Sequence, residues 1–181
     1  MDLRRVGYPN EDPTASSYAS AVYDLENRQA LTVGPVKAGS VHVPVGALPT
    51  KTKVLLRAEA PAGGPPAPPS PEGARISTLT DFFTVTVASP GASDWNAPVE
   101  VRIPVRNADV PDGQLIACFS QGAEATDWEP IPPLDAPGVL APGHRNGFYV
   151  SEDGEGRILH ILARHNGMFA GFRRTFVGDG R

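Results

Sequence analysis

Residues 82–105 read FFTVTVASPGASDWNAPVEVRIPV, and their pattern is the clearest indication of the fold class. Apolar residues alternate with polar ones on both sides of a polar corner that contains Pro90, Gly91 and Pro98. Because strand side chains point alternately to two faces, each half predicts a β-strand with one apolar face. The apolar set is Phe83, Val85, Val87, Val99, Val101, Ile103 and Val105. Such strands need a second layer to cover them, so the stretch predicts a packed β domain.

The same alternation recurs along the chain, with glycine and proline between the runs. This pattern predicts about nine strands and an all-β fold, an antiparallel β-sandwich of Ig-like or jelly-roll-like type. The predicted strands span residues 41–45, 52–60, 82–87, 99–105, 115–120, 128–131, 147–150, 157–162 and 167–177.

The N-terminal residues show the weakest strand pattern. Tyr18, Ala21, Val22 and Leu25 recur at helical spacing, which predicts a short helix in an otherwise irregular arm. The alternative is an extended arm that packs on the sandwich or on a partner. Val33 to Ser40 is interpreted as a turn region. The expected organisation is an arm over 1–32, a sandwich over 33–177 and a tail over 178–181.

Residues 61–73 are rich in proline, at positions 61, 65, 66, 68, 69 and 71. Proline removes a backbone donor and fixes φ near about −65°, so we expect an exposed polyproline-like loop. It is either a ligand for a proline-recognising groove or a tolerated insertion between strands. The residues expected to contact a partner are Tyr18, Tyr23, Pro65, Pro66, Pro68, Pro69 and Trp95.

Composition limits the function classes. The 181-residue chain has a net charge of −4, which argues against a nucleic-acid partner. The one cysteine, Cys118, lies in an apolar run and is expected to be a small buried residue. The first residues lack the apolar core of a signal peptide, and no run reaches the ~18 apolar residues of a membrane span. We therefore expect no direct membrane span.

The sequence offers no convincing catalytic or metal-binding set. His160 and His165 have no carboxylate or cysteine at metal-ligand spacing. Ser120 lacks the frame of a nucleophile elbow. We predict a protein without enzymatic activity, cofactor or metal. Calcium remains an alternative because of the acidic residues Asp109, Asp112, Glu152, Asp153 and Glu155. Carbohydrate binding rests on Trp95, which is otherwise a corner plug.

Two blocks resemble a known family. Residues 39–49, GSVHVPVGALP, and residues 97–104, APVEVRIP, are similar to two strands of the domain shared by zonula occludens proteins, netrin receptors and ankyrins. The domain also occurs in bacterial surface proteins. Trp128-Glu129-Pro130-Ile131 and residues 159–170 resemble the tail that often follows it. The resemblance covers roughly residues 33–172.

The resemblance implies a β-sandwich used for protein–protein contact without a cofactor. It favours an extracytoplasmic or cell-surface location and a partner in a larger membrane-associated or surface complex. Some members cleave themselves after the residue that follows the tail's His, with Ser as nucleophile. Here the run is His165-Asn166-Gly167, and Gly167 supplies no nucleophile. We expect no cleavage, a structural His165 and a tight turn at Asn166-Gly167.

The expected function is therefore a non-enzymatic interaction or structural module. It would be an accessory subunit of a larger assembly or a domain of a surface protein. Two alternatives stay open: a self-processing or hydrolytic domain, here with its self-cleavage nucleophile lost, and a carbohydrate- or calcium-binding sandwich.

Overall fold

The computed structural model describes residues 17–63, 66–88, 95–106, 109–121, 127–154 and 156–178, and these form an all-β protein. Beside the strands, they contain three 3-10 turns, η1 (Leu25–Asn27), η2 (Pro61–Gly63) and η3 (Asp112–Gln114). The strands are β1 (Ser17–Tyr23), β2 (Leu31–Val36), β3 (Gly39–Val43), β4 (Thr52–Glu59), β5 (Ala74–Thr78), β6 (Phe82–Val87), β7 (Val99–Pro104), β8 (Leu115–Ser120), β9 (Glu129–Ile131), β10 (Asn146–Asp153), β11 (Gly156–Ala163) and β12 (Gly167–Phe176).

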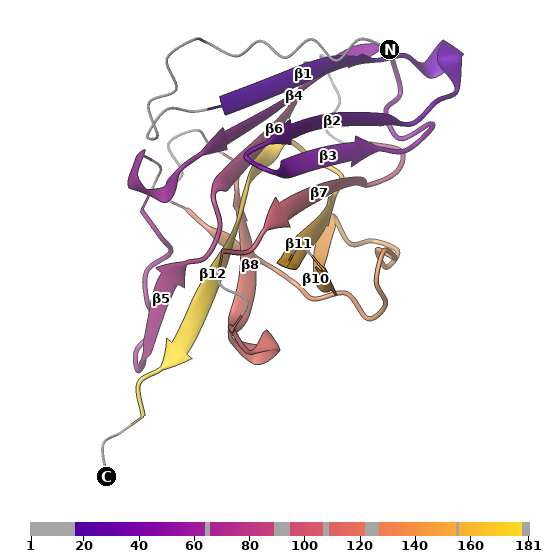
Figure 1. The fold of residues 1–181 in the computed structure, drawn as a ribbon. Helices are drawn as coiled ribbons and strands as arrows, with labels where there is room; N and C mark the ends of the chain where they lie inside the picture. The colour runs from indigo at the N-terminus through magenta and orange to yellow at the C-terminus, as the bar shows by residue number, and fades with distance from the viewer. Residues whose placement is uncertain are drawn as a thin grey trace.

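The strands form two antiparallel sheets (Figure 1). Sheet A has the order β1-β4-β6-β12-β8-β9, and β5 pairs with the far part of β12. Sheet B has the order β10-β11-β7-β3-β2. The prediction of an all-β, antiparallel protein is confirmed.

One hydrophobic core receives side chains from both sheets. Sheet A contributes Val54, Val85 and Phe169, and sheet B contributes Val41 and Val101. All seven apolar residues predicted from the 82–105 stretch are buried, which confirms the alternation. Each buried valine or larger side chain contributes about 1.5–3 kcal/mol relative to exposure.

The two strands of that stretch do not pair with each other. β6 pairs with β4 and β12 in sheet A, whereas β7 pairs with β11 and β3 in sheet B. The polar corner therefore carries the chain from one sheet to the other. Residues 89–94 of the corner lie outside the described residues.

The predicted N-terminal helix is wrong for the described part of the arm. Residues 17–23 form β1, which pairs with β4 along its length. Ala19 and Ala21 pack against the core and Tyr23 is 1% exposed, whereas Val22 is 48% exposed. Burial in this segment therefore alternates with a period of two residues. The backbone hydrogen bonds that β1 gains by pairing with β4 favour a strand more than the helical spacing of four side chains favours a helix.

The strand count of nine is also wrong, because the described residues contain twelve strands. The three missed strands are β1, β2 and β5. β2 was obscured by Gly34-Pro35, but it is an edge strand, where proline is tolerated. Its hairpin to β3 turns through Lys37 and Ala38, which have φ of 45° and 63°.

Gly39 marks a close approach between the sheets. It begins β3 in sheet B, and a Cβ atom there would lie 2.2 Å from Cε1 and 2.4 Å from Cζ of Phe83 in sheet A. The Phe83 ring thus occupies the space that a side chain at position 39 would need.

Candidate functional site

The outer face of sheet A carries a second apolar cluster, separate from the main core. Phe83 and Phe169 point into the core, so their neighbours on β6 and β12 point outward. We call this cluster the aromatic surface. Its buried members, which are 0–4% exposed because other side chains cover them, are Phe82, Cys118, Met168, Ala170 and Phe172, and the partly buried Trp128 packs against them.

Three rings form the centre of the aromatic surface. The Trp128 ring stacks on Phe82 with centroids 5.6 Å apart, and it meets Phe172 edge-on at 5.2 Å. Phe82 and Phe172 are 6.3 Å apart. Such ring pairs contribute about 0.5–1.5 kcal/mol beyond their burial. The three rings are far apart in sequence, and they meet because β6 pairs with β12, β12 pairs with β8, and β8 pairs with β9, which directly follows Trp128.

Part of the proline-rich loop covers this surface. The indole N–H of Trp128 donates to the carbonyl oxygen of Pro66 at 2.9 Å. Ala67 packs against the aromatic surface, and the backbone N–H of Ile76 donates to Ser70 Oγ at 3.1 Å. Ala67 and Pro68 are half-buried, whereas Pro66 and Pro69 are exposed. The prediction of an exposed loop therefore holds for Pro66 and Pro69, whereas Ala67 and Pro68 are partly covered.

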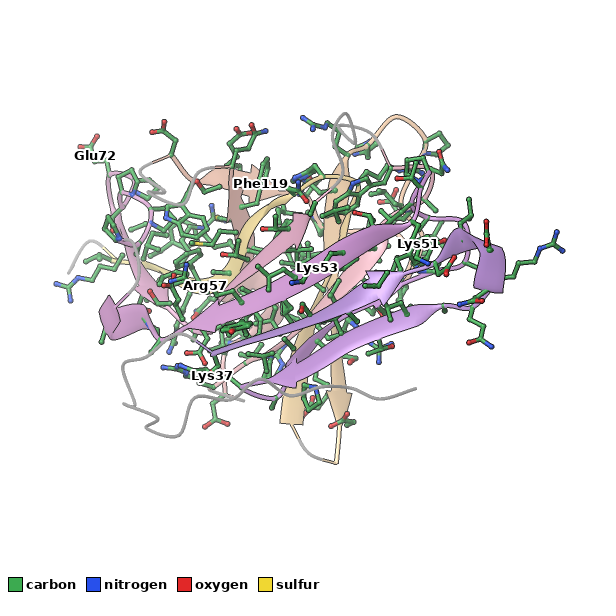
Figure 2. The ribbon with its side chains drawn as sticks, turned by 90° about the horizontal axis from the view of Figure 1, so that it is seen from above. Lys37, Lys51, Lys53, Arg57, Glu72 and Phe119 are labelled. Atoms are coloured by element: carbon green, nitrogen blue, oxygen red, sulfur yellow. The ribbon has the colours of Figure 1, made fainter. Side chains whose placement is uncertain are left out.

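Basic side chains lie beside the aromatic surface on the same face of sheet A. Lys53 and Arg57 share the outward parity of β4 and are both exposed, and Lys51 precedes them (Figure 2). Arg57 forms an ion pair with Glu59. The outer face of sheet A therefore changes from charged at β4 to aromatic at the start of β6 and along β12.

A polar network crosses the outer face of sheet B, with Glu100 of β7 at its centre. Glu100 accepts hydrogen bonds from His160 Nδ1 at 3.0 Å, Tyr149 Oη at 2.7 Å and Arg102 Nε at 2.9 Å. The Tyr149 and His160 rings stack with centroids 4.4 Å apart. The network ties β10, β11 and β7 together, and the Glu100 side chain is only 13% exposed.

These contacts shift two pKa values. The hydrogen bond from His160, followed by those from Tyr149 and Arg102, lowers the pKa of Glu100 to about 2, against an opposing effect of burial. Burial and the hydrogen bond to the Glu100 carboxylate raise the pKa of Tyr149 to about 12. At neutral pH the glutamate is therefore charged and the tyrosine neutral.

Ser151 extends this network into a relay. Its hydroxyl lies 2.7 Å from His160 Nε2, while His160 Nδ1 faces Glu100. A neutral imidazole with its proton on Nδ1 satisfies both contacts. The order serine, histidine and carboxylate is that of an activated serine nucleophile. Sequence reasoning missed it because the register of β10, β11 and β7 alone aligns residues so far apart.

His165 lies in a separate buried niche. It is 5% exposed, its Nε2 is 3.1 Å from Asn146 Nδ2, and its Nδ1 is 2.9 Å from the carbonyl oxygen of Asn166. Burial lowers its pKa, against the raising effect of the Asn166 carbonyl. Its ring packs 4.7 Å from that of Phe119. The prediction of a packed, hydrogen-bonded His165 is confirmed.

Gly167 lies beside this niche. A Cβ atom on Gly167 would lie 3.7 Å from His165 Nδ1. The predicted tight turn at Asn166-Gly167 is wrong: Gly167 already begins β12, and the connection joins strands of different sheets rather than closing a hairpin. Asn166 instead spans to Val87, whose N–H donates to Asn166 Oδ1 at 2.7 Å.

The residues expected to contact a partner are not together. Tyr23 and Trp95 are 1% and 2% exposed in the main core, so neither ring is presented at the surface of this chain. Trp95 is thus a plug between sheets, and its ring is not open for a sugar. Tyr18 is half-buried on β1. The Pro66 carbonyl oxygen lies beside the Trp128 indole, Pro68 is half-buried and Pro69 is exposed, and Pro65 lies outside the described residues.

Other expectations concern metal, membrane and thiol chemistry. Among the described residues, no group of three or more His, Cys, Asp or Glu side chains could hold a metal ion. No helix within the described ranges is long and apolar enough to cross a bilayer. Cys118 is 4% exposed, as predicted, and burial raises its pKa to about 11.

No protein-family model matches the chain, and no curated protein matches it.

Proposed function

We propose that this chain is a non-enzymatic β-sandwich that binds other proteins through the outer face of sheet A. The observation that carries the proposal is the aromatic surface. The outer face of an antiparallel sheet is usually polar because it meets water. Here Phe82 and Phe172 lie on that face, outside the main core, and are 1% and 0% exposed under their cover. The half-buried Trp128 completes the cluster and is its ring that reaches the surface.

Two further features support an interaction module. Aromatic residues and arginine are enriched at protein interfaces, and the rim around the interface core is polar and solvent-accessible. Lys53 and Arg57 provide such a rim along β4. The resemblance of residues 39–49 and 97–104 to the zonula occludens, netrin receptor and ankyrin domain supports the same class of function. The module would serve as an accessory subunit of a larger assembly or as a domain of a surface protein.

Site-specific photo-cross-linking tests the proposal. A benzophenone amino acid is placed at Pro69 or Arg57, both exposed on the proposed face, and at Val139, which is 63% exposed beside sheet B, as the control. In extracts of cells that express the gene, cross-linked products of one defined mass are expected from the first two positions. Equal products from Val139, or none from any position, would contradict the proposal.

One observation favours a second candidate, a serine-based hydrolase. In this candidate Ser151 Oγ adds to an ester carbonyl carbon while its proton passes to His160 Nε2. The alkoxide leaves with that proton, and water then hydrolyses the acyl-serine by the same route. The support is the Ser151–His160 separation of 2.7 Å, with Glu100 on the other ring nitrogen.

A fluorophosphonate probe decides between the candidates. The hydrolase candidate expects labelling of the wild-type chain and none of Ser151→Ala. If the chain is a non-enzymatic interaction module, the wild-type chain and Ser151→Ala should show the same background labelling, because the network then serves only to join β7, β10 and β11. Intact mass of the labelled chain identifies a single adduct.

A further inference from the structure

The aromatic surface and the segment over it show how one class of polypeptide is recognised. Residues 66–71, Pro-Ala-Pro-Pro-Ser-Pro, contain four prolines and only two residues with a backbone N–H. Such a segment cannot build a ladder of hydrogen bonds with a strand. It can offer flat rings and unsatisfied carbonyl oxygens to a surface.

The surface supplies the complementary groups. The Trp128 indole N–H donates to the Pro66 carbonyl, and the Phe82 ring lies against the indole. Proline-recognising domains bind extended proline-rich segments in aromatic-lined sites, because the polyproline conformation loses little entropy on binding. Within this chain, a carbonyl oxygen of such a segment accepts a hydrogen bond from an indole N–H, and the adjacent Ala67 packs against the aromatic surface.

We propose that the aromatic surface is a binding site for proline-rich polypeptides, and that residues 66–71 are its built-in, displaceable occupant. This inference rests on the proposed function, since it names the partner class of that same face. The occupant in the structure is what identifies the partner as proline-rich rather than helical or acidic.

The occupant is held by few contacts, which makes exchange feasible. Its polar anchors to the rest of the chain are Trp128 Nε1 to Pro66 O, Ile76 N to Ser70 Oγ and Ala74 N to Pro71 O. Its half-buried residues are only Ala67 and Pro68. A tethered occupant nevertheless competes at an effective concentration on the order of millimolar. Binding of an external peptide to the wild-type chain is therefore suppressed.

A variant that weakens the contact of residues 66–71 with the aromatic surface, here called the release variant, tests whether these residues block an external peptide. Pro66→Ser, Ala67→Asp and Pro68→Ser together remove two rings and place a carboxylate where Ala67 packs on the aromatic surface, which burial opposes. The control is Pro69→Ser, because Pro69 is exposed. Circular dichroism verifies that both remain folded.

The probe is a fluorescein-labelled peptide with the sequence of residues 64–72, and its binding is measured by anisotropy. We expect the release variant to bind at least tenfold more tightly than the wild-type chain, and Pro69→Ser to match the wild type. Adding Trp128→Phe to the release variant keeps a ring but removes the N–H, and should weaken binding about fivefold. A peptide with serine at every proline should bind none of them.

Two results would overturn the inference. The first is a folded release variant that binds the proline and serine peptides equally. The second applies if the release variant does not fold, and it is measured by NMR on the wild-type chain. At millimolar proline peptide we expect the Trp128 indole N–H resonance to shift while that of the buried Trp95 stays in place. An unshifted Trp128 resonance would overturn the inference. If neither effect occurs but cross-linking from position 69 persists, the partner class is wrong and the proposed function survives.

Discussion

Replacing Gly39 by alanine tests the face-to-face contact of the two sheets. The added Cβ would lie 2.2 Å from Cε1 and 2.4 Å from Cζ of Phe83, and 2.9 Å from the Arg102 carbonyl oxygen. Ordinary carbon contacts are about 3.5–4.0 Å, so the ring or the strand must move by more than an ångström. Phe83 is 1% exposed and belongs to the main core, so its ring has little room to move.

The expected loss of stability follows from this overlap. Overpacking of a filled core costs about 1–3 kcal/mol. The lower entropy of the unfolded alanine chain offsets only about 0.4–1 kcal/mol of it. Phe83→Leu alone should cost on the order of 1 kcal/mol, because it shortens the buried side chain. In the double variant the smaller side chain makes room for the new methyl group.

Urea denaturation of the four proteins measures this coupling. The loss of unfolding free energy in the double variant should be smaller than the sum of the two single losses by at least about 0.5–1 kcal/mol. Gly113→Ala is the matched control, because a Cβ atom there meets nothing within 4 Å. The contact between sheets is refuted if Gly39→Ala costs no more than Gly113→Ala, or if the two single losses simply add.

Three further predictions concern other parts of the fold. The pKa of Glu100 is lowered to about 2 from 4.5, chiefly by His160, so its contribution is complete above pH 4.5 and is lost as the pH falls toward 2. Between those values the wild type should lose about 1–2 kcal/mol more stability than Glu100→Gln in urea titrations, after allowance for solvent screening; parallel curves would contradict this. Ala38→Gly should raise stability by about 0.5–1 kcal/mol, seen as a higher Tm, because Ala38 has φ of 63°; an unchanged or lower Tm would count against a strained turn. Cys118, 4% exposed with a pKa of about 11, should react with a thiol reagent only as fast as the chain opens; immediate modification of the folded chain would place it at the surface.

The alternation in residues 82–105 was sufficient to predict which side chains enter the core. It could not predict that β6 and β7 lie in different sheets, because a corner and a crossover have the same turn residues. The helical spacing of Tyr18, Ala21 and Leu25 misled for a related reason. Short alternating segments become strands only when a partner such as β4 completes their hydrogen bonds.

Residues near in space but distant in sequence set both candidate sites. Glu100 and His160 meet because β7 and β11 pair in one register, in which His160 lies opposite Arg102. Trp128 meets Pro66 because the loop between β4 and β5 crosses the outer face of sheet A. No local pattern in the chain encodes either contact.

The period-two burial, and therefore the all-β class, could be predicted from the local sequence, since alternation is a local property of each strand. It could also be predicted that the loop at 61–73 would not become a helix or a central strand, since proline lacks the donor. The tertiary structure alone decided strand order and register, and with them which polar groups meet on sheet B and which rings meet on sheet A. Those contacts depend on long-range pairing, whose free energy is shared across whole strands.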